Sequence, residues 1–428
     1  MSLGAPWYPN CCGPNKEGVM VSIWEARRMV LENAPLLGEV EVPLAEAAGH
    51  VLAQKVASDV DLPPFHKSAM DGYAVRAEDV RDLPAVLKVA EDVPAGKFPE
   101  RPLAPGKCTR VMTGAPVPEG TDLVVMVEDT EPLPDGRVRI LKAPRDKTNV
   151  CPKGEDVKEG EVVLSPGHIL GPPEIGLLAA VGAERVRVFR RPKVAVLATG
   201  DELVCAGERP GPGQIRDVNT YSLLALCMKR GFDAESLGIA RDEPGELRER
   251  IRLGMGEADV VLVSAGVSVG DYDFVPDVLW ELGVRTVFHK VAMKPGKPTV
   301  FGVYDGGVLF GLPGNPVSTI VTFLLFVDPV LRRMAGFPVG ELAPLKALLD
   351  GRLVNKGDRT AIKPCLLARE GAGWRATPVE SHGSADIASL SKANAFMVIG
   401  REERLELGDT VDVIPMEVGC CLLLEAGG

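Results

Sequence analysis

The sequence lacks several features that define large classes of proteins. Its nine cysteines form no CxxC pair and their number is odd, which argues against a disulfide scaffold or a structural zinc site and favours a reducing compartment. The N-terminal residues include three prolines but not the apolar core that a signal peptide requires. The longest apolar run, Thr319 to Val327, is far shorter than the roughly 20 residues of a membrane span. We therefore expect a soluble, cytoplasmic protein that does not enter a membrane.

Excess positive charge is also absent. The chain has 59 acidic residues against 48 Lys and Arg, and its formal net charge is −11. Nucleic acid therefore has no global electrostatic reason to bind, and a smaller anion would need a local basic pocket. The length of 428 residues allows about three domains of roughly 150 residues each.

The residue pattern of the N-terminal half of the chain changes twice, from helical spacing to short β-type runs and then to a strand and a helix. Apolar residues at helical spacing follow Ser22, and "LAEAAGHVLAQKV" repeats that pattern, so two short helices are expected at the start. Short β-type runs punctuated by Pro and Gly then indicate a small all-β module. A strand and a capped helix follow this module. We therefore predict a linker domain of two segments, 20–61 and 151–190, with a β domain inserted at 62–150.

The next part, 191–338, alternates continuous apolar strands with helical segments. Uniformly apolar strands of this kind indicate a parallel sheet covered on both faces, and such sheets bind ligands beyond the carboxyl ends of their strands. The β texture returns in 339–428, which ends in a hairpin-like pair around Gly408 and Asp409. The expected fold class is thus α/β plus all-β modules: a doubly wound, mostly parallel α/β domain combined with linker, inserted β and C-terminal β domains.

Two glycine-rich loops follow strands of this sheet. In "VVLVSAGVSVGDYDFVP" the strand leads into Gly266, Ser268 and Gly270, where missing side chains let backbone N–H groups approach an anion. The second loop, "GLPGNPVST" (Gly311 to Thr319), opens a helix whose free N–H groups and dipole also favour an anion. Phosphate is the natural candidate, although both loops fit tight turns equally well.

Several carboxylates follow strands of the same sheet: Asp201, Glu202, Asp242, Asp271 and Asp273. Carboxylates beside a phosphate repel it unless a hard cation lies between them. Mg²⁺ held by one or two carboxylates and phosphate oxygens meets that need. Helix capping is an alternative that fits Asp201 and Asp271 at least as well.

Three lysines, Lys290, Lys294 and Lys297, lie between the two loops in "HKVAMKPGKPTVFG". Single lysines usually extend over the surface, but Pro295 and Pro298 prevent a solvated helix here. A fixed pair of ammonium groups at Lys294 and Lys297 suits a tetrahedral oxyanion or a phosphate.

Eight motifs, taken in order, resemble a known family. They are "PPFHKSAMDGYAV", "VMTGAPVPEGTDLVV", "GEDVKEG", "LATGDEL", "GQIRDVNTYSL", "SAGVSVGDYD", "MKPGKP" and "LPGNPVS". From about Ser22 to its end, the chain is similar to the molybdenum insertases, or molybdopterin molybdenumtransferases, which include the bacterial MoeA proteins and the E domain of gephyrin.

The resemblance implies an enzymatic reaction in which adenylylated molybdopterin and molybdate give molybdenum cofactor and AMP, with Mg²⁺. It also implies an elongated homodimer with the active site between subunits, a MogA-like α/β domain and a barrel-like C-terminal domain. Candidate partners are then a molybdopterin adenylyltransferase and apo-molybdoenzymes, with no nucleic acid and no membrane.

The same resemblance implies roles for individual residues. The Mg²⁺ ligands and nucleotide-proximal carboxylates would be Glu202, Asp242 and Asp273. The phosphates and the pterin would be contacted by Gly266, Ser268, Gly270, Pro313, Gly314 and Asn315. Phosphate or molybdate would be held by Lys290, Lys294 and Lys297, with a C-terminal contribution from Arg359 and Ser389. Three catalytic residues could reach the pocket only across a domain or subunit boundary: Asp71, Thr113 and Asp156.

Three positions depart from the family pattern. His66 stands where an acidic or amide residue is usual, Cys151 where an Arg is frequent, and Lys363 where a second Arg is usual. Lys153 could replace from nearby the charge lost at Cys151. Lys363 does not form the bidentate contacts of the usual Arg. The choice between molybdate and tungstate therefore stays open.

Two other functions stay open at this point. The α/β domain could adenylylate molybdopterin with ATP, although the β module and the C-terminal domain argue against that activity. The chain could also be a non-enzymatic scaffold, as the second role of gephyrin permits.

Overall fold

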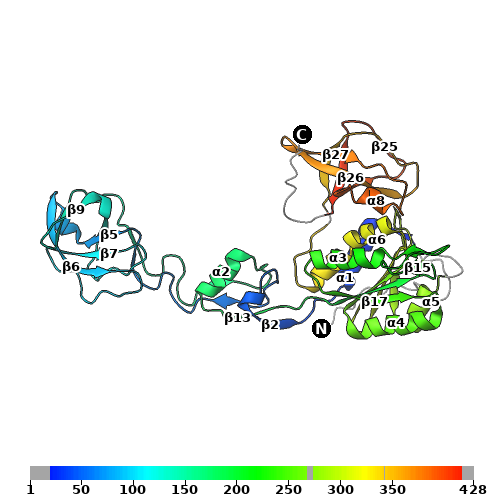
Figure 1. The fold of residues 1–428 in the computed structure, drawn as a ribbon, viewed down its shortest axis with the longest axis horizontal. Helices are drawn as coiled ribbons and strands as arrows, with labels where there is room; N and C mark the ends of the chain where they lie inside the picture. Colours follow the sequence, from blue (N-terminus) through cyan, green and yellow to red (C-terminus); the bar gives the residue numbers. More distant parts are fainter. Residues whose placement is uncertain (1–19, 268–272, 342, 417–428) are drawn as a thin grey trace, which may run out of the picture. The chain divides into compact units, whose positions relative to one another are not determined.

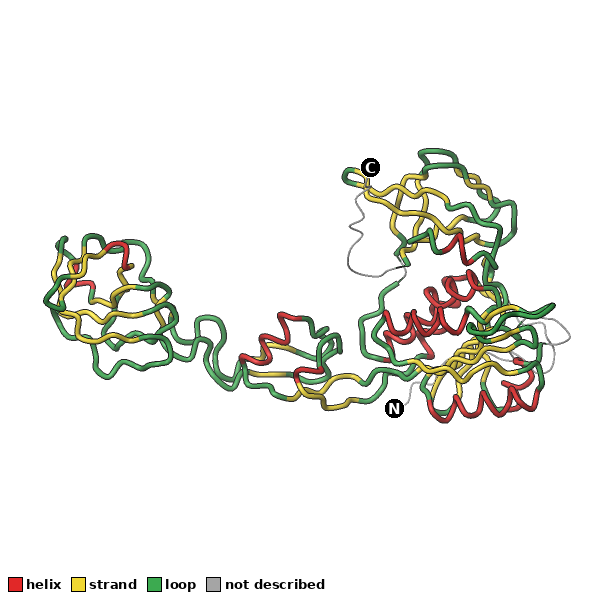
Figure 2. Tube along the Cα trace, in the orientation of Figure 1, coloured by secondary structure: helices red, strands yellow, loops and turns green. Residues whose placement is uncertain are grey.

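The computed structural model describes residues 20–267, 273–341 and 343–416. The chain forms two compact units, one made of Met1–Val40 and Phe189–Gly428 and the other of Glu41–Val188. Figures 1 and 2 show the helices and strands of each unit. Within the described ranges, none of the helices has both the length and the hydropathy that crossing a bilayer demands.

A six-stranded sheet in the order β17-β14-β18-β23-β22-β19 forms the centre of the first unit. Strands β17, β14, β18 and β23 are parallel; at one edge β22 pairs antiparallel with β23, and β19 pairs antiparallel with β22. The strands are β14 (Val194–Thr199), β17 (Ala234–Ala240), β18 (Val260–Ser264), β19 (Arg285–Phe288), β22 (Val300–Tyr304) and β23 (Gly307–Leu312). Every residue of β14, β18 and β23 is buried, which confirms the mostly parallel sheet predicted from their uniformly apolar sequences.

Helices cover both faces of this sheet (Figure 1). Alternate residues of β18 enter different cores: Val260 and Leu262 pack with α1, α3, α6 and α7, whereas Val261 and Val263 pack with α4 and α5. The helices are α1 (Ile23–Asn33), α3 (Asn219–Lys229), α4 (Pro244–Glu257), α5 (Val275–Glu281), α6 (Pro316–Thr322) and α7 (Asp328–Met334). A π-helical turn, η4 (Phe323–Val327), joins α6 to α7, so the longest apolar run, Thr319 to Val327, is helical throughout.

A buried ion pair joins the end of α3 to α7. Arg230 Nε lies 3.1 Å from Asp328 Oδ1, and each side chain is only 7% exposed. Arg230 Nη2 also donates to the carbonyl of Met416 at 2.8 Å. Burial raises the pKa of Asp328, while the guanidinium of Arg230 opposes that rise. Loss of either partner would leave an uncompensated charge in the core.

The C-terminal residues form a closed five-stranded barrel, in which β26, β27, β24, β30 and β28 pair in that order and β28 pairs again with β26. The strands are β24 (Leu345–Leu349), β26 (Thr360–Glu370), β27 (Gly373–Pro378), β28 (Ala395–Ile399) and β30 (Thr410–Pro415). Helix α8 (Ile387–Leu390) contributes Leu390 to the core shared with α6 and α7, and β28 contributes Phe396. The barrel therefore packs directly on the helical layer of the α/β domain.

The hairpin predicted around Gly408 and Asp409 is wrong. The strand before that turn, β29 (Arg404–Leu405), pairs with β25 (Leu353–Val354). The strand after it, β30, pairs with β24 and β28. Barrel closure requires β30 to lie between β24 and β28. Both edges of β30 are then occupied, so it cannot also pair with β29.

Short strands complete this unit. They are β1 (Met20–Val21), β15 (Leu203–Val204), β16 (Ile215–Arg216), β20 (Lys290–Val291) and β21 (Met293–Lys294). Strand β1 pairs with β20, and β15 pairs with β16. Strand β21 pairs in parallel with β26 of the barrel, so the α/β domain and the barrel share one sheet.

The unit Glu41–Val188 contains a second six-stranded sheet, in the order β8-β5-β7-β6-β10-β9. Its strands are β5 (Gly72–Val75), β6 (Ala85–Val93), β7 (Lys107–Val111), β8 (Leu123–Met126), β9 (Thr130–Pro132) and β10 (Arg137–Ile140), with 3-10 helices η2 (Ala77–Val80) and η3 (Val127–Asp129). The all-β module predicted within 62–150 is therefore present.

The segments before and after the six-stranded sheet in the sequence form a smaller hydrophobic core together. It combines Leu52 and Val56 with Leu164 and Leu178. The elements around it are β2 (Glu39–Pro43), η1 (Leu44–Glu46), β3 (Val56–Ala57), β12 (Val162–Leu164), α2 (Pro172–Ala180) and β13 (Arg185–Phe189). Strands β4 (Lys67–Ser68) and β11 (Val150–Cys151) pair with each other, and Val150 packs instead against a core of the six-stranded sheet. Residues from both predicted linker segments thus share a core, while the four-domain boundaries themselves stay predictions.

The prediction of a second helix over "LAEAAGHVLAQKV" is wrong, because only the single 3-10 turn η1 forms there. After it, Gly49 has a φ of 75°, and Val51 and Leu52 form β-bridges with Ile169 and Val188. These bridges link residues more than a hundred positions apart in the sequence. Such tertiary pairing overrides a local helical periodicity.

The buried ion pair yields a stability prediction. Asp328→Ala should lower the free energy of unfolding by about 3–5 kcal/mol, because Arg230 would remain buried without its partner. Urea denaturation followed by circular dichroism measures the change. The matched control is Glu32→Ala, which removes the exposed Arg28–Glu32 pair on α1 and should cost no more than about 0.5 kcal/mol. Equal losses in the two variants would contradict this account.

Candidate functional site

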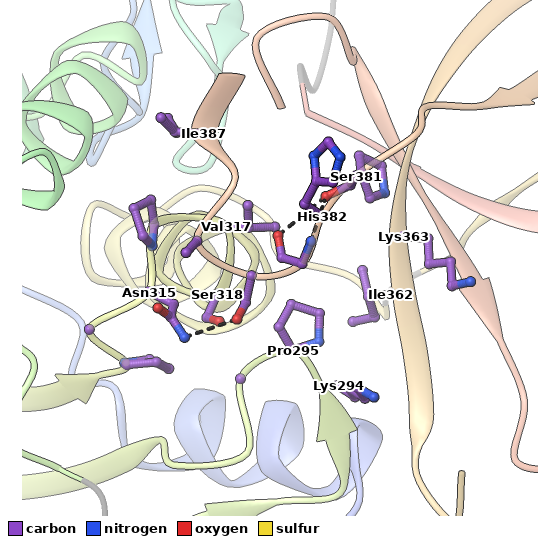
Figure 3. A pocket seen from close by; sticks show the side chains of 18 of the residues that line it. Lys294, Pro295, Asn315, Val317, Ser318, Ile362, Lys363, Ser381, His382 and Ile387 are labelled. Carbon is purple, nitrogen blue, oxygen red and sulfur yellow. Dashed lines mark hydrogen bonds between the residues drawn. The ribbon is translucent and has the colours of Figure 1, made fainter. Parts of the chain in front are cut away.

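A cleft of about 1780 Å³ is lined by residues of the central sheet's carboxyl edge and of the barrel. Figure 3 shows part of its lining, with Asn315 and Ser318 at the start of α6 and with Ile362 and Lys363 on β26. Seven of the residues predicted from the sequence line it: Glu202, Lys294, Lys297, Pro313, Gly314, Asn315 and Arg359. The other described candidates of this unit do not line it: Asp242, Gly266, Asp273, Lys290 and Ser389. Ser268, Gly270 and Asp271 lie outside the described residues.

Positive side chains predominate in the lining. They are Arg216, Lys294, Lys297, Arg352, Lys356, Arg359 and Lys363, against the acidic Glu202, Asp217 and Glu380. In the described part of the chain, Lys294, Lys297, Lys356 and Lys363 have no carboxylate partner. Unpaired positive charge gathered in a cleft raises the local concentration of anions, so the cleft is suited to an anionic ligand in an otherwise acidic protein.

The two glycine loops lie against each other at this edge. Gly266 has a φ of 66°, and an added Cβ would lie 2.7 Å from Val275 Cγ2 and 3.0 Å from Thr199 Oγ1. A Cβ added to Gly314 would lie 3.2 Å from the Cβ of Ala265. Glycine is therefore required at 266 both by its backbone conformation and by the space around it.

Asn219 ties the two loops together. Its Nδ2 donates to Ser264 Oγ at 2.8 Å and to the carbonyl of Gly314 at 2.7 Å. A carbonyl can only accept, so the contact with Gly314 sets the orientation of the amide. Asn219 Oδ1 is buried and has no hydrogen-bond partner among the described residues. The sequence reasoning missed this residue, although it lies in the quoted motif "GQIRDVNTYSL".

The predicted metal-binding carboxylates differ in their surroundings. Asp242 Oδ1 accepts a hydrogen bond from Thr199 Oγ1 at 2.9 Å, Glu202 is exposed and Asp273 is half-buried. The described ranges contain no group of three or more His, Cys, Asp or Glu residues arranged to hold a metal ion. The assignment of these three carboxylates to Mg²⁺ therefore stays a prediction.

The lysine segment is held by close contacts. Gly296 has a φ of 105°, and a Cβ there would lie 2.3 Å from Met293 Cε. Its carbonyl accepts a hydrogen bond from Thr299 Oγ1 at 2.8 Å. Lys294 and Lys297 therefore project from a tightly packed turn at the cleft, whereas Lys290 belongs to β20.

The barrel contributes Arg359 and Lys363 to the cleft. Arg359 Nη1 donates to the carbonyl of Met293 at 3.2 Å, so its guanidinium holds the strand that carries Lys294. Ser389 is buried, and its hydroxyl donates to the carbonyl of Asp386 at 2.9 Å. A role for Ser389 in substrate binding stays a prediction.

Asp386 anchors a part of the lining that the sequence reasoning did not single out. The backbone N–H groups of Ser389 and His382 donate to its carboxylate and lower its pKa to about 2. His382 and Ser381 line the cleft (Figure 3). Through these hydrogen bonds Asp386 fixes this loop at the start of α8.

Two predicted residues meet within the unit Glu41–Val188. Asp71 Oδ1 accepts hydrogen bonds from the backbone N–H of Thr113 at 2.7 Å and from its hydroxyl at 2.8 Å. These bonds lower the pKa of Asp71. Asp156 is exposed, and its backbone N–H donates to the carbonyl of Leu62 at 2.9 Å.

The departures from the family pattern also lie in this unit, apart from Lys363. His66 Nδ1 accepts from the backbone N–H of Lys153 at 3.1 Å. Lys153 Nζ lies 3.1 Å from Asp61 Oδ2, so its charge is already paired. Lys153 is therefore a poor replacement for the positive charge missing at Cys151.

Family models match most of the chain. The model "MoeA N-terminal region (domain I and II)" matches residues 21–182, "Probable molybdopterin binding domain" matches 195–333, and "MoeA C-terminal region (domain IV)" matches 346–416.

Individual relatives agree with these models. The chain is 38% identical to a molybdopterin molybdenumtransferase from Nostoc sp., with 91% of each chain covered. It is 35% identical to the protein of that name from Haemophilus influenzae, with 92% of this chain and 98% of the relative covered. The crystal structure of a molybdopterin biosynthesis MoeA protein from Pyrococcus horikosii has a TM-score of 0.80 and 34% identity, with 94% of this chain and 100% of the other covered.

The contact between Asp71 and Thr113 can be tested by titration. Thr113→Val removes the hydroxyl donor and keeps the backbone N–H, so the pKa of Asp71 should rise. Thr113→Ser keeps both donors and should leave it unchanged. Carbon-13 NMR of the Asp71 carboxyl during a pH titration of the full chain measures both values.

The sign of the effect on stability follows from the lowered pKa. The two hydrogen bonds stabilise the folded chain above the unfolded pKa of about 3.9, and this contribution is lost as the pH falls through the lower folded value. In Thr113→Val, the loss of folding free energy that protonation of Asp71 causes at low pH should therefore be smaller. An unshifted Asp71 pKa in Thr113→Val would show that the hydroxyl contributes nothing.

Proposed function

The chain belongs to the molybdopterin molybdenumtransferase family of enzymes, and on that premise we propose that it inserts molybdenum from molybdate into adenylylated molybdopterin. Cleavage of the phosphoanhydride would release AMP and leave molybdenum cofactor. The observation that carries this proposal is the cleft with unpaired Lys294, Lys297, Lys356 and Lys363 in a protein of net charge −11. Both substrates are anions, and a preorganised positive cleft favours them over neutral ligands.

The reaction places few chemical demands on the protein. Two oxygens of molybdate are replaced by the two dithiolene sulfurs, and the displaced oxygens leave as water after taking up protons. Cleavage of the phosphoanhydride consumes one water molecule, and no group is oxidised or reduced. The side chains of the cleft would mainly position the two substrates and offset their charge.

We propose Mg²⁺ as the cofactor, with one or two carboxylates drawn from Glu202, Asp242 and Asp273 as its protein ligands. An all-carboxylate donor set fits a hard cation, and Mg²⁺ usually takes only one or two carboxylates together with phosphate oxygens and water. The lack of a three-carboxylate cluster among the described residues is compatible with that mode of binding. Bound Mg²⁺ would offset negative charge on the leaving phosphate.

We also propose that the protein acts in the cytoplasm as a homodimer. Its upstream partner would be a molybdopterin adenylyltransferase, and apo-molybdoenzymes would receive the product. These proposals rest on the family alone.

Single-turnover release of AMP tests the function. Adenylylated molybdopterin and Mg²⁺ are mixed with the protein in three parallel samples, containing molybdate, tungstate or no oxyanion. We expect AMP release that depends on an oxyanion, and the faster sample identifies the preferred one. Consumption of ATP with metal-free molybdopterin would instead indicate an adenylyltransferase, and inactivity in every sample would favour a scaffold.

A charge-removing variant tests the cleft itself. Lys294→Ala should lower the rate of AMP release by roughly 10- to 100-fold, the value of one charge-assisted hydrogen bond. Lys346→Ala is the matched control, because Lys346 is an exposed lysine of β24 that pairs with Asp412. It should alter the rate by less than about two-fold. Full activity of Lys294→Ala would remove the cleft from the proposed site.

A further inference from the structure

A buried asparagine, Asn355, organises the part of the barrel that faces the cleft. It is 8% exposed and follows β25. Its Nδ2 donates to the carbonyl of Arg359 at 2.8 Å and to the carbonyl of Gly400 at 2.6 Å. Its Oδ1 accepts from the backbone N–H of Gly357 at 3.1 Å. Both donors and the acceptor of the amide are therefore used by the backbone around it.

These contacts fix a short loop that carries two of the cleft's cations. The loop runs from Asn355 to Arg359 and includes Lys356, and all three side chains line the cleft. The backbone N–H of Asn355 donates to the carbonyl of Glu403 at 2.9 Å, which adds a second anchor to the opposite turn. Without the amide, the carbonyls of Arg359 and Gly400 and the N–H of Gly357 would lose this partner.

The side chain of Arg359 connects this loop of the barrel to the α/β domain. Its Nη1 donates to the carbonyl of Met293, the residue before Lys294. The same strand, β21, pairs with β26 in the register Met293 with Thr360 and Lys294 with Ala361. Figure 3 shows Lys294 and Pro295 beside Ile362 of β26. The position of Lys294 thus depends on the backbone that Asn355 holds.

We propose that Asn355 is a positioning residue for the anion site: through Arg359 it fixes Lys294, and so determines how tightly the cleft binds an oxyanion. This inference rests on the proposed function, because it takes molybdate as the anion. Asn355 itself need not touch the substrate. Its effect would reach the substrate through the hydrogen bond from Arg359 to Met293.

The barrel contains a matched control. Asn394 also bridges backbone groups, since its Nδ2 donates to the carbonyl of Leu367 at 2.9 Å and its Oδ1 accepts from the N–H of the same residue at 2.7 Å. Neither Asn394 nor Leu367 lines the cleft. Substitutions at Asn355 and Asn394 should therefore destabilise the barrel in a similar way, but only those at Asn355 should alter anion binding.

The experiment measures binding of molybdate alone to the full chain by isothermal titration calorimetry, together with the thermal midpoint. Asn355→Ala should weaken molybdate binding by about five- to ten-fold, the range expected for coupled neighbouring groups. Asn394→Ala should leave binding within about two-fold of the unsubstituted protein. The pair Asn355→Ser and Asn394→Ser serves if either alanine variant fails to fold, because both keep a short polar side chain and add no charge that would itself repel molybdate.

A double variant separates positioning from general destabilisation. If Asn355 acts through Arg359, the double variant of Asn355→Ala with Arg359→Ala should bind molybdate no more weakly than Arg359→Ala alone. The thermal midpoint should instead fall further in the double variant. Additive losses of affinity, or equal losses at Asn355 and Asn394, would overturn the positioning role.

The remaining outcomes distinguish this inference from the proposed function. Unchanged affinity in both Asn355 variants, with normal binding by the unsubstituted protein, would reject the positioning role and leave the function standing. Failure of the unsubstituted protein to bind molybdate would reject the function and this inference with it.

Discussion

The parallel register of three buried strands is the constraint on which the rest of the site depends. Ala198 of β14 lies beside Ser264 of β18, and Ser264 lies beside Leu312 of β23. Each strand therefore ends at the same edge of the sheet, and the loops that follow begin side by side. Burial on both faces maintains this register, because a shift would move apolar side chains out of two separate cores at once. Because the strands end together, the single amide of Asn219 can bind both Ser264 and Gly314.

The barrel turns this edge into a cleft. It packs on the helical layer through Leu390 and Phe396, and it takes β21 of the α/β domain into its own sheet. The lysine turn is thereby held from two sides, by Gly296 and Met293 within the α/β domain and by Arg359 from the barrel. The α/β domain and the barrel, which each contain a hydrophobic cluster of their own, thus share the segment that carries Lys294.

Electrostatics explains why such a rigid arrangement is useful. Like charges gathered without counter-ions repel, and this repulsion destabilises the folded state until an anion binds. A packed turn and a hydrogen-bonded loop keep the ammonium groups in place in spite of that repulsion. Asp386 illustrates the opposite case behind the lining of the cleft, because backbone N–H groups of Ser389 and His382 stabilise its charge and thereby fix the loop of His382.

Local sequence determined much of this protein. Uniformly apolar strands at 194–199, 260–264 and 307–312 indicated a parallel sheet, because only burial on both faces tolerates such runs. Eight ordered motifs indicated the family, and the prolines of "MKPGKP" argued against a solvated helix at the lysines that line the cleft. Tertiary structure decided what local pattern could not. The helical spacing of "LAEAAGHVLAQKV" gave way to β-bridges with residues more than a hundred positions away, and the turn at Gly408 joined strands with different partners. The roles of Asn219 and Asn355 depend on carbonyls brought to them by other strands. Periodicity reports which face of an element is buried, whereas a hydrogen bond between distant residues exists only once the chain has folded.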